Sequence, residues 1–168
     1  MRHLNAHGLF SRGTFASLTS LDLGVMPNVT SDTLSAISAA CPALTHVNLE
    51  RCRFECLLRQ SLLSSRGSLF ATLVNGMGGR LLHLNVAGCA LGGVIESDVL
   101  FALARCPNLE RIDLSAYLGA IGAAEGAALG TSCPKLTHVC LARSKRATPL
   151  GIAELARNAP ELRSLDVS

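Results

Sequence analysis

Cysteine, histidine and aspartate recur near one another in the last third of the chain, and nucleophilic catalysis and metal binding use these residue types. His138 and Cys140 lie two residues apart, and Asp113 and Asp166 lie at similar separations before and after them. A thiol, an imidazole and two carboxylates would suit a cysteine nucleophile or a metal centre. The elements that carry these residues decide whether the groups can meet.

A further pair of thiols, Cys52 and Cys56, has the spacing Cys-x-x-x-Cys that would begin a zinc site. No second pair with ligand spacing follows, so we expect no metal and no cofactor. The seven cysteines are odd in number, are not grouped in tight pairs and follow no secretory signal. They favour free thiols and an intracellular location, cytoplasmic or nuclear.

The composition indicates one apolar domain with an unusual core. The 168 residues are 49% hydrophobic and only 4% aromatic, with a formal net charge of +3 and a mean hydropathy of +0.37. The low charge excludes a disordered chain, and a net charge of +3 predicts no nucleic-acid partner. The longest uncharged apolar stretch, residues 81–95, is shorter than the roughly 20 residues of a membrane span, so we expect no membrane contact.

The scarcity of rings is explained by an internal repeat. The pattern Leu-x-x-Leu-x-Leu, with Val or Ile allowed, occurs at residues 18–23, 44–49, 81–86, 109–114, 136–141 and 162–167. Successive first leucines are 26, 37, 28, 27 and 26 residues apart. Such regularity predicts that small aliphatic residues recur because each repeat supplies the same layer of the core.

Within each repeat the apolar period changes. Residues 4 and 6 of the pattern alternate with polar residues, as in a half-buried strand, whereas Leu34, Ile37 and Cys41 follow helical spacing. We expect Ser31 or Asp32 to cap the first helix. One strand and one helix cannot bury their own apolar faces, so stacking is required. The sequence therefore predicts an α/β solenoid of about six repeats, with a parallel sheet on its concave face and helices on its convex face.

Three kinds of residue flank the repeated pattern: Cys41–Pro42, Cys106–Pro107 and Cys133–Pro134 before the strands, Cys52 and Cys89 after them, and Ser31–Asp32 and Ser97–Asp98 before the helices. With these residues the repeat resembles the leucine-rich-repeat family, and in particular the cysteine-containing subtype of F-box/leucine-rich-repeat proteins. The resemblance covers residues 18–168, which we take as the repeat domain with an insertion around 53–67. Residues 1–17 are expected to be a partial repeat or a frayed segment.

Several repeats depart from this subtype. Ala159–Pro160 lacks the thiol, and Gly78–Gly79 replaces Cys-Pro. The cysteine position after the strand is occupied in three repeats by Met26, Tyr117 and Ser144. We expect Cys52 and Cys89 to turn inward, where a weak donor meets a backbone carbonyl, and to stay reduced.

In this repeat, positions 3 and 5 of the pattern point onto the concave face, as two columns. Position 3 reads Ser20, His46, His83, Arg111, His138 and Ser164, and position 5 reads Asp22, Asn48, Asn85, Asp113, Cys140 and Asp166. Position 7 is mostly small, except for Glu50. These residues are the predicted partner-binding surface, unless they serve only to solvate the sheet and to pair across strands. Three histidines in one column predict pH-sensitive binding.

This placement argues against catalysis. Side chains at i and i+2 of a strand, such as His138 and Cys140, project in parallel from Cα atoms about 6.5–7 Å apart. No oxyanion hole or phosphate loop is evident, so we expect no enzyme. Arg143, Lys145 and Arg146 form a basic spot on the rim, which either contacts an acidic partner or aids solubility.

The sequence predicts a non-catalytic module that binds a protein on its concave face. The family resemblance implies the substrate-recognition arm of an SCF-type ubiquitin ligase and therefore ubiquitin-ligase components as partners. The alternatives are a structural or regulatory leucine-rich-repeat scaffold unrelated to ubiquitin, or a fragment of a longer leucine-rich-repeat protein.

Overall fold

The computed structural model describes residues 8, 10, 13–27, 29–52, 69–89, 103, 105–116 and 120–168, with only the backbone for 69–71. The insertion expected around 53–67, together with Cys56, Ser97–Asp98 and Tyr117, lies outside the described residues.

Among the described residues, six short strands form one open parallel sheet in chain order. They are β1 (Ser20–Asp22), β2 (His46–Asn48), β3 (His83–Asn85), β4 (Arg111–Asp113), β5 (His138–Cys140) and β6 (Ser164–Asp166). Each strand occupies positions 3–5 of the repeat, and like positions are paired across every junction. The predicted α/β solenoid is confirmed. The register follows from the repeat, because the same positions of the pattern form the strand each time.

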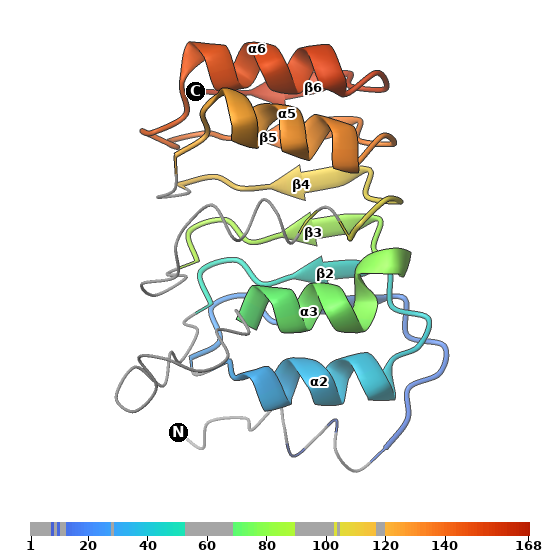
Figure 1. Cartoon of the computed structure of the whole chain (residues 1–168). Helices are drawn as coiled ribbons and strands as arrows, with labels where there is room; N and C mark the ends of the chain where they lie inside the picture. The colour runs from blue at the N-terminus through green and yellow to red at the C-terminus, as the bar shows by residue number, and fades with distance from the viewer. Residues whose placement is uncertain are drawn as a thin grey trace, which may run out of the picture.

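Helices cover one side of the sheet (Figure 1). The described helices are α2 (Ser31–Ala40), α3 (Leu69–Met77), α5 (Ala123–Ser132) and α6 (Pro149–Asn158), with a 3-10 turn, η1, at Gly78–Arg80. The expected cap of α2 was wrong. Thr30, one residue earlier, accepts the backbone N–H of Thr33 at 3.2 Å. Ser31 and Asp32 already lie in the first turn of the helix, so neither can occupy the capping position.

The core lies between the sheet and the helices and consists mainly of aliphatic residues from each repeat. The first leucines of the four inner repeats, Leu44, Leu81, Leu109 and Leu136, are fully buried. The corresponding Leu18 and Leu162 of the outer repeats are only partly buried. Burial in this stack therefore depends on a neighbour on both sides.

The cysteines serve the packing between repeats. The thiol of Cys52 donates to the Leu23 carbonyl at 3.0 Å, and that of Cys89 donates to the Leu49 carbonyl at 2.8 Å. The expected inward contacts are thus confirmed. Ser144 occupies the same position, and its hydroxyl donates to the Leu114 carbonyl at 3.1 Å. A hydroxyl therefore replaces the thiol without changing the contact.

Candidate functional site

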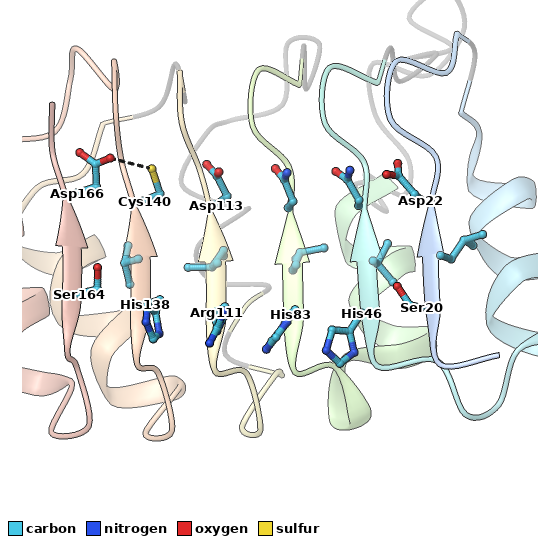
Figure 2. A pocket seen from close by; sticks show the side chains of 17 residues that line it. Ser20, Asp22, His46, His83, Arg111, Asp113, His138, Cys140, Ser164 and Asp166 are labelled. Atoms are coloured by element: carbon cyan, nitrogen blue, oxygen red, sulfur yellow. Dashed lines mark hydrogen bonds between the residues drawn. The ribbon is translucent and has the colours of Figure 1, made fainter. Parts of the chain in front are cut away.

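The concave face of the sheet is an open groove of about 580 Å³. Figure 2 shows the outward side chains of the six strands in two parallel columns. Every residue predicted for the concave face lines the groove except Glu50, whose carboxylate lies 3.5 Å from the Arg51 Nε atom. Aliphatic residues of position 4, which sequence reasoning assigned to the core alone, also border it: Leu21, Val47, Leu84, Ile112 and Val139.

The side chains at the strand ends are held in place by backbone N–H groups of the turns that follow the strands. In five of the six strands, an Asp or Asn oxygen accepts the N–H two residues later. The bonds are Asp22–Gly24 at 2.7 Å, Asn48–Glu50 at 3.0 Å, Asn85–Ala87 at 2.9 Å, Asp113–Ser115 at 2.8 Å and Asp166–Ser168 at 3.0 Å. Each side chain thus closes the turn that follows its strand.

These backbone bonds also fix the charge of the two outer carboxylates. The Gly24 N–H, followed by the Asn48 side chain, lowers the pKa of Asp22 below its usual value. The Ser168 N–H does the same for the pKa of Asp166. Both groups are therefore anions at neutral pH, and they place a negative charge beside the strand ends on each outer strand.

The column at the strand starts contains three imidazoles and one guanidinium, with a serine at each outer strand. The rings of His46 and His83 meet edge to face, with their centroids 4.1 Å apart. The Nε2 atom of His83 lies 4.0 Å from a carboxylate oxygen of Glu110. Burial, and then the neighbouring His46 and Arg111, lower the pKa of His83. We therefore expect His83 to be neutral at physiological pH.

Threonines hold the other two rings. The Thr45 hydroxyl donates to the Thr19 carbonyl at 3.2 Å and lies 2.8 Å from Nδ1 of His46. Its only proton is used by the carbonyl, so it must accept from the ring. His46 therefore carries its proton on Nδ1, and its Nε2 atom remains an acceptor in the neutral form.

The same arrangement recurs three strands later. The Thr137 hydroxyl donates to the Glu110 carbonyl at 2.9 Å and lies 2.8 Å from Nδ1 of His138. The dipeptide Thr-His in these two repeats was the sequence signal for this contact, and our reading of the sequence missed it. His83 follows Leu82 and has no such support.

Comparison with solved structures identifies this architecture. The chain is similar to a leucine-rich-repeat-containing protein, LegL7, from Legionella pneumophila, with a TM-score of 0.59 and 16% identity. The chain has the leucine-rich-repeat fold. The match covers 99% of the chain but about half, 52%, of the Legionella protein. No family model and no curated protein matches the sequence.

Cys140 interrupts the Asp/Asn column of this leucine-rich-repeat sheet. Its sulfur lies 3.0 Å from the Ser115 hydroxyl and 3.6 Å from a carboxylate oxygen of Asp166. In the described part of the chain, His138 Nδ1 bonds to Thr137 rather than to this thiol. The groups that sequence reasoning considered for nucleophilic chemistry therefore lie near one another without the thiol–imidazole bond that would activate a cysteine.

The three residues predicted as a basic spot on the rim lie outside the groove. Arg143, Lys145 and Arg146 follow β5 and are exposed, but they do not line the groove. Among the described residues, no cluster of three histidine, cysteine or acidic side chains is placed to hold a metal. The described helices include none with the length and apolarity to cross a bilayer.

Proposed function

We propose that the chain is a non-catalytic module that binds a protein partner in the concave groove. The single observation that carries this proposal is the groove itself, in which two columns of polar side chains project from six strands into an open volume of about 580 Å³. Leucine-rich-repeat sheets expose such side chains at fixed intervals, which suits the recognition of an extended surface. The proposed location is intracellular, because the described cysteines are free and, except for Cys140, buried.

The test compares the two faces of one repeat. A photo-reactive benzoylphenylalanine is placed either at Ser164, which is exposed in the groove, or at Ala153, which is exposed on α6. We expect a partner to be captured from Ser164 alone. That partner should then bind the purified chain, and Ser164→Trp should block binding whereas Ala153→Trp should not. Equal blocking by both variants, or by neither, contradicts binding in the groove.

A finer proposal concerns the partner system. The cysteine pattern at Cys41, Cys106, Cys133, Cys52 and Cys89 supports a role as the substrate-recognition arm of an SCF-type ubiquitin ligase. In that case the protein, expressed in its native cells, co-purifies with the ligase adaptor, and its groove partner gains ubiquitin. A groove partner bound without adaptor and without ubiquitin transfer favours the alternative, a regulatory scaffold unrelated to ubiquitin.

A further inference from the structure

The strand-start column contains four nitrogen-bearing side chains on four consecutive strands. His46, His83, Arg111 and His138 are paired in register from β2 to β5. With strands about 4.8 Å apart, the row extends over roughly 14 Å. Figure 2 shows all four on the same side of the groove. We call these four residues the basic row.

Arg111 is the centre of this row and has unused binding capacity. Its side chain is exposed, and among the described residues no carboxylate lies within ion-pair distance of its guanidinium. A guanidinium presents a planar fork of donors that matches a carboxylate. The flanking His83 and His138 add a donor at Nε2 once they are protonated.

The protein already places one carboxylate against the row. Glu110 approaches Nε2 of His83 at 4.0 Å, and its side chain is half exposed. Glu110 therefore shows that a carboxylate fits beside these rings. Because this contact is long and exposed, it is weak, and an incoming carboxylate can replace it at little cost.

The charges of the opposite column lie away from the row. Asp113 leaves β4 two residues after Arg111, and one of its oxygens is bonded to the Ser115 N–H in the following turn. Asp22 and Asp166 are held at the strand ends in the same way. The groove is thus basic along the strand starts and acidic along the strand ends.

We propose that the basic row docks an acidic segment of the protein partner, with a carboxylate on Arg111 between His83 and His138. This inference rests on the proposed function and specifies the chemistry of the partner. The donors are spread one per strand, so they match several single carboxylates better than one phosphate group. The acidic column fixes the orientation, because the partner's carboxylates must avoid the strand ends.

Binding of carboxylates is expected to depend on pH. The groups that face His83 are His46 on β2, Arg111 on β4, Glu110 immediately before β4, and His138 on β5. His138 faces Arg111 across one junction and Ser164 across the other. A bound carboxylate offsets the repulsion within the row, so binding takes up protons and strengthens as the pH falls towards 6.

The test uses acetylated hexaglutamate amide as a probe of the complete chain and hexaglutamine as its neutral match. We expect hexaglutamate to shift the ring signals of His83 and His138 in a saturable NMR titration at about pH 6, and hexaglutamine to shift neither. Affinity should fall by roughly tenfold or more at pH 8. Absence of a shift with millimolar hexaglutamate at about pH 6 overturns the proposal.

Charge variants separate a local site from general attraction. Arg111→Gln should weaken hexaglutamate binding by about tenfold, whereas Arg157→Gln, which removes the same charge from α6, should change it by less than about twofold. Glu110→Gln should strengthen binding because it removes the internal competitor. Equal effects of the two arginine variants contradict a site at Arg111.

The two proposals fail separately. If Ser164→Trp blocks binding of the captured partner but Arg111→Gln leaves that binding unchanged, binding in the groove is supported and the proposal of an acidic segment is wrong. If the partner is insensitive to both variants, groove binding itself is wrong. The contact segment of the captured partner gives a direct check, because a segment without Asp or Glu contradicts the inference.

Discussion

The N-terminal half of the molecule, β1–β3 with α2 and α3, and the C-terminal half, β4–β6 with α5 and α6, use the same repeat differently. In the C-terminal half, backbone approaches backbone: a Cβ atom added at Gly126 would lie 2.0 Å from the Gly151 oxygen. In the N-terminal half, side chains make the contact, since Ser38 donates to the Gly76 carbonyl at 2.7 Å.

The concave face differs between the halves as well. The strands β2 and β3 place His46 beside His83 and Asn48 beside Asn85, so identical residues pair across this junction. The strands β4 to β6 carry Arg111, Asp113 and Asp166, with Cys140 interrupting the column. A repeat can thus keep its backbone conformation while its outward residues change from pairs of identical residues to charged side chains.

The largest expected effect concerns the helix contacts. Gly151→Ala would place a Cβ atom 2.1 Å from the Ile121 carbonyl oxygen, and rigid backbone cannot yield. We expect a loss of about 3 kcal/mol in unfolding free energy, measured by urea denaturation. Gly76→Ala meets only the Ser38 side chain. Its Oγ atom can rotate away, and its Cβ atom, 2.8 Å from the new atom, requires a small shift between the two helices, so the variant should cost about 1–2 kcal/mol. Gly79→Ala, in open space, is the control. Equal losses at Gly151 and Gly76 would remove the contrast between the halves.

The next effect concerns the buried donors. Cys52→Ala removes a fully buried thiol and its bond to the Leu23 carbonyl, so we expect a loss of about 1–2 kcal/mol. Cys52→Ser should cost less than Cys52→Ala, because Ser144 makes the same contact in the C-terminal half. Urea unfolding of both variants measures the difference. A serine variant as unstable as the alanine variant would show that the halves need different donors.

A smaller pair of effects has opposite signs. Asn85→Ala removes the acceptor for the Ala87 N–H and should destabilise the fold by about 1 kcal/mol. Cys140→Asn supplies the acceptor that the other five strands have at this position and should stabilise the fold by about 0.5 kcal/mol. Thermal unfolding of the two variants gives both signs. Destabilisation by Cys140→Asn would mean that the contacts of the thiol with Ser115 and Asp166 stabilise the fold more than the hydrogen bond gained by the asparagine.

The smallest expected effect is the pH dependence of stability from His83. Its pKa is lowered in the folded state by burial and by the neighbouring His46 and Arg111, so the unfolded chain binds the proton more readily. Its contribution is therefore fully present above the unfolded pKa of about 6.5 and is lost as the pH falls through the lower folded pKa. His83→Asn should reduce the loss of stability between pH 7.5 and 5.5, followed by urea unfolding. An unchanged loss would assign the pH effect to other groups.

Much of the face was predictable from the repeat. Because side chains alternate along a strand, the outward placement of His83, Asn85, Arg111 and Asp113 followed from the position of each residue in the pattern. Glu50 was predicted on this face but does not line the groove, since it lies two residues beyond the end of β2, with its carboxylate beside Arg51. The cap at Thr30 was missed because Thr30, Ser31 and Asp32 are all acceptable capping residues, and only the start of the helix selects one.

The strands, their register and the two faces follow from the repeat alone, since each of these depends on a period repeated within and between segments of about 27 residues. The folded structure was needed to show that Thr45 and Thr137 hold the protons of His46 and His138 on Nδ1. It also showed that the Ser144 hydroxyl makes the same carbonyl contact as the cysteine it replaces and that Gly126 meets Gly151. These features require atoms about one repeat apart in the chain to lie within a few ångströms, and stacking alone brings them together.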